Sequence, residues 1–135
     1  MRLASPGTVA KAAFTYFSAV FAVAFLLGAF RVLYVAPRFG PLHAVLLEVP
    51  LVLAFSWIVA GRCLRRWPVT AAGPKALLAM GALAFLLLML AEAGLAVLAF
   101  GQSPTSFLQA MGAPAGLLGL AGQIGFALIP ALRGR

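Results

Sequence analysis

Residues Ala76–Phe100 read ALLAMGALAFLLLMLAEAGLAVLAF, a continuous apolar run whose only ionisable side chain is Glu92. A helix of this length, at about 1.5 Å per residue, crosses the hydrocarbon core of a bilayer, which is about 30 Å thick. Three further segments have the same character, near Ala12–Ala36, Leu42–Gly61 and Pro114–Leu132. Backbone polar groups cannot stay unpaired in lipid, and no segment alternates polar and apolar residues as a barrel strand does. The fold class is therefore predicted to be all-α, a bundle of four transmembrane helices with antiparallel neighbours.

The composition favours the same class of protein. Hydrophobic residues make up 64% of the 135 residues and charged residues make up 9%. A soluble domain is about a quarter charged and less than half apolar. A chain of this length encloses one core at most, so the surplus of apolar side chains must face lipid. Residues 1–135 are therefore predicted to form a single integral membrane domain.

The basic residues are distributed unequally about the four apolar segments. Arg38 lies in the short outer loop and Arg31 lies within the first segment, and the remaining lysines and arginines fall on the opposite side. That larger set consists of Arg2, Lys11, Arg62, Arg65, Arg66, Lys75, Arg133 and Arg135. Because cytoplasmic loops carry the excess of Lys and Arg, both termini are predicted to be cytoplasmic.

The net charge of +8 indicates lipid rather than nucleic acid as the partner. No base-stacking aromatic side chains accompany the basic residues, so the pattern of a nucleic-acid binder is absent. The cluster of Arg62, Arg65 and Arg66 instead predicts contact with anionic lipid headgroups. Two amphipathic rings, Tyr16 and Trp67, are expected at the same membrane interface.

The fourth apolar segment and its approach are rich in glycine, with Gly112, Gly116, Gly119 and Gly122. Small residues let membrane helices approach closely, so this segment is predicted to pack tightly against another helix. The partner can be a helix of the same chain or of a second copy in a homo-oligomer, and the sequence leaves both alternatives open.

The loop between the third and fourth segments is predicted to contain a short helix. Ser103 suits the N-cap of such a helix and Pro104 suits its first position. Phe107, Leu108 and Met111 are then expected to share one face, with the helix lying flat on the outer surface. Two interpretations remain open, one in which this helix covers a site between the long helices and one in which it rests among lipid headgroups.

Each of the four segments carries one strongly polar side chain in the outer half of the membrane. Helical rise places Arg31 about 7 to 8 Å deep and Glu48 about 9 Å deep. The same rise places Glu92 about 12 Å deep and Gln123 about 14 Å deep. Ionised groups within a bilayer are costly, so the four side chains are expected to face one another inside the bundle.

The depths of these groups predict how they pair. Arg31 does not lose its proton, so it is predicted to pair with an ionised Glu48 on the adjacent helix. Glu92 then lacks a basic partner and is predicted to be protonated, donating a hydrogen bond to Gln123 or to a backbone carbonyl.

Two accessory residues lie near Glu48 in the sequence. Pro50 leaves one backbone carbonyl without its helical donor, which is typical of a bend or of an ion or proton site. His43 is expected at the headgroup level, where a histidine is more often solvated than functional. His43, Glu48 and Glu92 lack the spacing of a metal motif, and Cys63 is the single cysteine, so neither a metal nor a cofactor is predicted.

The first two segments contain the residues Phe30-Arg31-Val32-Leu33, Pro37-Arg38-Phe39-Gly40, Glu48-Val49-Pro50 and Ser56-Trp57. This set resembles a group of small uncharacterised bacterial inner-membrane proteins with four predicted spans. The resemblance implies the plasma membrane of a bacterium as the location and implies no activity. In size and span number the chain is also similar to small multidrug-resistance transporters, but those carry an essential acid in the first helix, where this chain has Arg31.

Three functions are compatible with these residues. The preferred prediction is a non-enzymatic multi-pass inner-membrane protein whose Arg31, Glu48, Glu92 and Gln123 cluster has a structural or partner-binding role. The alternative is a small oligomeric proton-coupled transporter or channel for a small solute. The third is a membrane enzyme acting on a lipid-type substrate, although no nucleophile–base pair or phosphate-cradling loop is visible.

Overall fold

The computed structural model describes residues 6–99 and 101–134. Four stretches of this part of the chain are helical and are long and apolar enough to cross a membrane. They are Pro6–Phe39, Pro41–Arg66, Pro74–Ala99 and Pro114–Arg133. The prediction of an all-helical chain with four helices of membrane-spanning length is confirmed.

Two of the four stretches change from α-helix to the wider π-helix near one end. In chain order the elements are α1 (Pro6–Phe30), the π-helix η1 (Arg31–Val35), α2 (Ala36–Phe39), α3 (Pro41–Arg66), the 3-10 turn η2 (Thr70–Ala72), α4 (Pro74–Gly94), the π-helix η3 (Leu95–Ala99), α5 (Pro104–Met111) and α6 (Pro114–Arg133). The short helix predicted before the fourth span is thus present as α5.

The first two long helices extend further than the sequence predicted. The described part of α1 extends from Pro6, earlier than the predicted start near Ala12. α3 continues to Arg66, beyond the predicted end at Gly61. Trp67 ends this helix because it precedes a proline and adopts an extended conformation, with φ −123° and ψ 134°.

Several cations that were expected in loops therefore lie on helices. Arg62, Arg65 and Arg66 occupy the last turns of α3, Lys11 lies within α1, and Lys75 lies in the first turn of α4. Arg2, Phe100 and Arg135, to which predictions above also refer, lie outside the described residues. The end of the bundle that carries Lys11, Arg62, Arg65, Arg66, Lys75 and Arg133 is called the basic end below.

The turn after the first long helix is confined to Gly40. Pro37, Gly40 and Pro41 are residue types that commonly end a helix, but the helix continues through α2 as far as Phe39. Pro37 occupies the first turn of α2, and the N–H of Ala36 donates to the carbonyl of Arg31 in the π-helical pattern. Gly40 then reverses the chain with a φ of 86°, a conformation that glycine adopts without strain.

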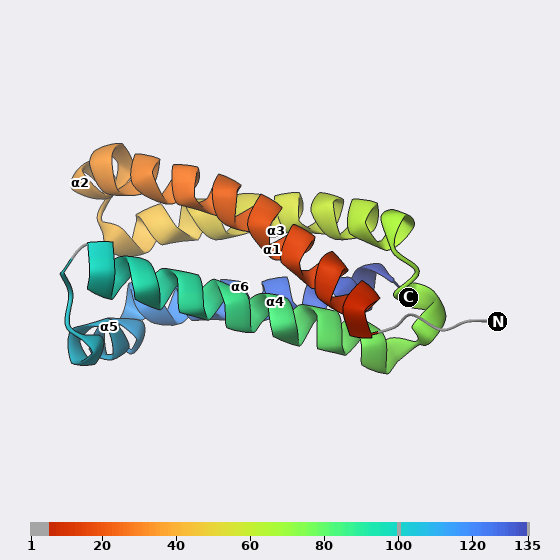
Figure 1. Cartoon of the computed structure of the whole chain (residues 1–135). Coiled ribbons are helices and arrows are strands. Elements are labelled where there is room, and N and C mark those ends of the chain that lie inside the picture. The colour runs from red at the N-terminus through yellow and green to blue at the C-terminus, as the bar shows by residue number, and fades with distance from the viewer. Residues whose placement is uncertain (1–5, 100, 135) are drawn as a thin grey trace.

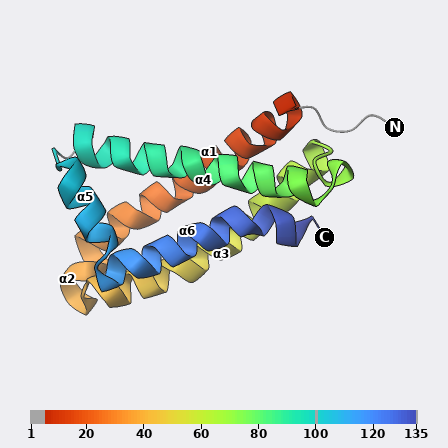
Figure 2. The same ribbon diagram turned by 90° about the horizontal axis from the view of Figure 1, so that it is seen from below.

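Figures 1 and 2 show how the helices are arranged. The start of α1, the α3–α4 connection and the end of α6 lie at the basic end, while α2 and α5 lie at the other end, called the α5 end below (Figure 1). α3 packs against α1 and α6, and α4 packs against the same two helices. Within the described residues, the consecutive helices α3 and α4 thus have their main contacts with α1 and α6 rather than with each other.

The apolar core lies in the half of the bundle toward the basic end. Its buried side chains include Ala13, Val59, Leu77, Met80 and Ile129. At its centre the hydroxyl of Tyr16 donates to the carbonyl of Phe126 at 2.6 Å, and the two rings stack with their centroids 4.4 Å apart. The expectation that Tyr16 lies at the membrane interface is wrong. The ring is fully buried because its hydroxyl finds an acceptor inside the bundle.

α4 and α6 approach each other closely at Gly81. A Cβ atom at this position would overlap the carbonyl oxygen of Ala127 on α6. Close backbone contact of this kind stabilises membrane helices, between which the hydrophobic effect gives little attraction. The sequence predicted close packing for the glycines of the fourth segment. It did not indicate that Gly81, in the third segment, contacts the backbone of another helix.

Candidate functional site

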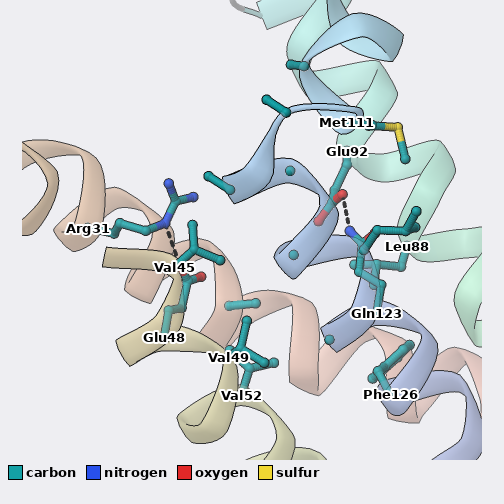
Figure 3. A pocket seen from close by; sticks show the side chains of 18 of the residues that line it. Arg31, Val45, Glu48, Val49, Val52, Leu88, Glu92, Met111, Gln123 and Phe126 are labelled. Carbon is teal, nitrogen blue, oxygen red and sulfur yellow. Dashed lines mark hydrogen bonds and ion pairs between the residues drawn. The ribbon is translucent and has the colours of Figure 1, made fainter. Parts of the chain in front are cut away.

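The first polar contact of the site joins α1 to α3. Arg31 is the first residue of η1, and its Nε donates to a carboxylate oxygen of Glu48 on α3 (Figure 3). The side chains of Arg31 and Glu48 are 30% and 17% exposed, so both are partly buried. The predicted pairing of Arg31 with Glu48 is confirmed, and it brings together the end of one long helix and the start of the next.

The second polar contact joins α4 to α6. Nε2 of Gln123 donates to Oε2 of Glu92 (Figure 3). The sequence predicted a hydrogen bond between these two residues, with the carboxyl group as the donor. In the structure the amide is the donor and the carboxyl oxygen is the acceptor. The partner is therefore as expected, and the direction of the hydrogen bond is reversed.

A cavity of about 480 Å³ lies between the two polar pairs. Figure 3 shows Arg31 and Glu48 on one side of it and Glu92 and Gln123 on the other. The remaining lining residues are mostly apolar or small: Val20, Ala24, Val45, Val49, Val52, Leu53, Leu88, Gln102, Phe107, Ala110, Met111, Ala113, Ala115, Gly116, Gly119, Leu120, Gly122 and Phe126. The four polar groups thus line one cavity but form two separate pairs rather than a single cluster.

The cavity ends at the apolar core. Val20 on α1, Leu88 on α4 and Phe126 on α6 line it and are buried, with exposed fractions of 1%, 6% and 1%. Behind Phe126 the stacked ring of Tyr16 belongs to the core described above. The cavity is consequently closed toward the basic end.

At its other end the cavity is bordered by α5. The side chain of Ser103 accepts a hydrogen bond from the N–H of Ser106 at 3.0 Å, which is the predicted N-cap. Phe107 and Met111 line the cavity, whereas Leu108, which was expected on the same face, is 66% exposed and does not line it. Of the two interpretations of this short helix, the structure favours the one in which it covers a site between the long helices.

Two of the three helical stretches that line the cavity with a charged side chain become π-helical beside it, whereas α3, which carries Glu48, stays α-helical. η1 begins at Arg31, and η3 begins shortly after Glu92, whose carbonyl accepts from the N–H of Leu95. π-Helical segments occur frequently at functional sites, because the extra residue in the turn changes where side chains point. The sequence did not predict either segment, although Pro37 is a signal for the first.

The two accessory residues lie outside the cavity. His43 and Pro50 are exposed on α3, and neither lines the cavity. α3 continues as one helix through Pro50. Over residues 6–99 and 101–134, no group of three or more His, Cys, Asp or Glu side chains is placed to hold a metal ion.

The glycines of the fourth span serve different purposes. A Cβ at Gly116 would overlap the carbonyl of Ala110, and a Cβ at Gly122 would lie 3.0 Å from the side chain of Val49. Gly119, by contrast, lines the cavity and has no neighbouring atom within 4 Å of an added Cβ. Two of the glycines predicted for helix contact are therefore used within the chain, and a third enlarges the cavity.

No protein-family model matches this chain, and comparison with curated proteins and with solved structures finds no similar protein.

Proposed function

We propose that this chain is a non-enzymatic multi-pass membrane protein that binds a small amphiphilic ligand in the cavity between the α1/α3 pair and the α4/α6 pair. The observation that carries the proposal is the cavity of about 480 Å³ with apolar walls and a polar pair on each side. Binding sites for small molecules have this volume and this composition, a mostly apolar lining with a few placed polar groups.

The two polar pairs also have a structural part in this proposal. Each pair joins two neighbouring helices, α1 to α3 through Arg31 and α4 to α6 through Gln123. Neither polar pair crosses the cavity. Each helix pair is therefore held together on its own, and the space between the two helix pairs stays open. The structural role predicted from the sequence is thus proposed for these two polar pairs, which join neighbouring helices and flank the cavity.

The proposed orientation places the basic end in the cytoplasm and the cavity in the outer half of the bilayer. It is supported by the six cations of the basic end, compared with Arg38 at the α5 end. Consecutive long helices then cross the membrane in antiparallel directions. A bacterial plasma membrane is part of the proposed location.

The chemistry of the lining supports binding rather than covalent catalysis. The polar side chains among the described lining residues are Arg31, Glu48, Glu92, Gln102 and Gln123. This set provides charge and hydrogen bonds but no hydroxyl or thiol nucleophile. The apolar part of a ligand would contact the valine, leucine and phenylalanine side chains, and its polar part would lie between the two pairs.

One observation favours a transporter as the second candidate. The cavity lies between two helix pairs, and both charged wall positions on α1 and α4 adjoin π-helical segments. Movement of one helix pair relative to the other would open the apolar core and expose the ligand to the opposite side of the membrane. This candidate predicts proton-dependent uptake in proteoliposomes that Glu92→Gln abolishes, whereas simple binding predicts no such uptake.

The binding proposal is tested by filling the cavity. Gly119→Leu should occupy part of it, since Gly119 lines the cavity and nothing lies within 4 Å of an added Cβ. Gly94→Leu is the matched control, because Gly94 also has no neighbour within 4 Å and does not line the cavity. Purified wild type and both variants are photolabelled with a diazirine-bearing medium-chain fatty acid, and the labelled peptides are identified by mass spectrometry.

The expected result is labelling of cavity residues on α6 in the wild type and in Gly94→Leu, and loss of this label in Gly119→Leu. Equal labelling of all three proteins would contradict a ligand site in the cavity. Thermal unfolding of each variant in detergent is the control for folding. Leucine is a better helix former than glycine, so neither substitution is expected to lower the unfolding temperature.

A further inference from the structure

Arg133, at the end of α6, lies against the face of α3. Its guanidinium carbon is 5.4 Å from the centroid of the Trp57 ring, a cation–π contact. A Cβ at Gly61 would come within 2.7 to 2.9 Å of the guanidinium group. The missing side chain at Gly61 and the ring of Trp57 together hold Arg133 in one place on α3.

Among the residues that the structure describes, no acidic side chain pairs with this arginine. The sequence contains two acidic side chains, Glu48 and Glu92, and both line the cavity in the other half of the bundle. Glu48 precedes Gly61 by about 20 Å along α3, from the helical rise. Nε of Arg133 is buried and has no hydrogen-bond acceptor among the described residues. An arginine held in this way, with no counterion among the described residues, is suited to bind an anion from outside the chain.

A second arginine continues the same face of α3. Trp57, Gly61 and Arg65 are spaced four residues apart, which places them in one row along the helix. Arg65 is exposed and lies one turn beyond the position where Arg133 rests. Two guanidinium groups can therefore approach one anion at the basic end of the α3–α6 contact.

The surroundings of this arginine pair are those of a lipid-facing surface. Trp57 on α3 is 43% exposed, and Leu132, which precedes Arg133 on α6, is 48% exposed. Both lie on helices of membrane-spanning length. An anion bound here would carry its apolar part along these side chains, which fits a phospholipid better than a soluble ion.

We propose that Arg133 and Arg65, arranged about Trp57 and Gly61, bind the phosphate headgroup of an anionic phospholipid at the basic end of the bundle. This site is separate from the cavity and does not depend on the ligand proposed there. It makes the anionic-lipid contact predicted for Arg62, Arg65 and Arg66 specific, since it requires a guanidinium group in a fixed position and not merely a positive surface.

The test measures retained phospholipid by native mass spectrometry. Full-length protein is equilibrated in detergent with equal amounts of phosphatidylglycerol and phosphatidylcholine. Wild type should retain phosphatidylglycerol preferentially, and Arg133→Gln should weaken this retention by about tenfold to a hundredfold, the range for losing charge-assisted hydrogen bonds. Arg62→Gln, which removes one exposed charge outside the row, should weaken it by no more than about fivefold.

Gly61→Ala separates geometry from charge. It keeps the number of cations unchanged but displaces the guanidinium group of Arg133, so it should weaken phosphatidylglycerol retention by about tenfold. Thermal unfolding identifies any variant that fails to fold. Arg133→Lys keeps the charge but not the guanidinium group, so it should show an intermediate loss of phosphatidylglycerol retention.

Three outcomes would overturn the proposal. Equal losses in Arg133→Gln and Arg62→Gln would indicate general surface electrostatics. Equal retention of phosphatidylglycerol and phosphatidylcholine by the wild type would show that no anionic headgroup is selected. Displacement of bound phosphatidylglycerol by millimolar inorganic phosphate would identify a soluble anion, rather than a lipid, as the occupant.

Discussion

The two halves of this bundle are held together by different interactions. Toward the basic end, apolar side chains fill the centre, and Tyr16 joins α1 to α6 directly. Toward the α5 end, the Arg31–Glu48 and Glu92–Gln123 contacts each join two adjacent helices. The apolar half is therefore closed across its whole section, whereas the polar half is divided into two pairs with a cavity between them.

In the membrane setting proposed above, this difference follows from what stabilises helices in lipid. Apolar side chains gain little by leaving lipid for a protein interior, so close packing of small residues and hydrogen bonds provide most of the attraction. Close packing acts wherever backbones can touch, as at Gly81, and it leaves no space. A polar pair fulfils the hydrogen bonding of its own polar atoms and leaves the neighbouring volume unfilled.

The largest effect is expected from disrupting the backbone contact between α4 and α6 in the apolar half. Gly81→Leu places a side chain where the carbonyl of Ala127 now lies, so α4 and α6 must separate. The free energy of unfolding should fall by about 3 kcal/mol, the upper part of the range for overpacking. Sodium dodecyl sulfate titration in mixed micelles, followed by circular dichroism, measures it. Gly94→Leu is the control, and equal stability of the two variants would contradict the importance of this contact.

A smaller effect is expected from breaking the ion pair of the polar half. Glu48→Gln leaves Arg31 without its counterion in the span and should lower the free energy of unfolding by about 2 kcal/mol, less than a mid-bilayer charge costs. Glu92→Gln is the matched comparison. An amide oxygen at position 92 still accepts from Gln123, so its effect should be below about 0.5 kcal/mol. The same titration compares the two variants.

The double variant Arg31→Met with Glu48→Gln sharpens this comparison. Removing both partners leaves no unpaired charge, so the double variant should be more stable than Glu48→Gln alone. If the double variant loses as much stability as the sum of the single variants, the two side chains act independently. Such additivity would contradict the assignment of this pair as an interaction that joins η1 to α3.

The polar contacts could be predicted from the sequence because charge in a membrane allows few alternatives. Arg31 and Glu48 lie at similar depths on helices joined by a short turn, so their pairing follows from the cost of leaving either alone. Glu92 and Gln123 follow from the same reasoning. The N-cap at Ser103 could be predicted because its residue type and the proline after it form a local signal.

The features that depend on distant packing could not be predicted in this way. Tyr16 has the residue type of an interfacial ring, and only the position of the Phe126 carbonyl explains its burial. The separation of α3 from α4 depends on which helix faces are complementary, and the hydropathy of the four spans hardly distinguishes those faces. The cavity has no sequence signal of its own, because it is the volume that the side chains of four helices and α5 leave empty.

The smallest global effect is expected at the border of the cavity. Ser103→Ala removes the N-cap acceptor of α5, which is worth about 1 kcal/mol to a helix. Since α5 contributes no residue to the buried core, the loss should stay local, with little change in the unfolding midpoint and faster amide hydrogen exchange in α5 than in α6. Thr105→Ala, on the exposed part of the same helix, is the control. If exchange accelerates equally in both helices, α5 unfolds together with the bundle and does not form a separately opening cover.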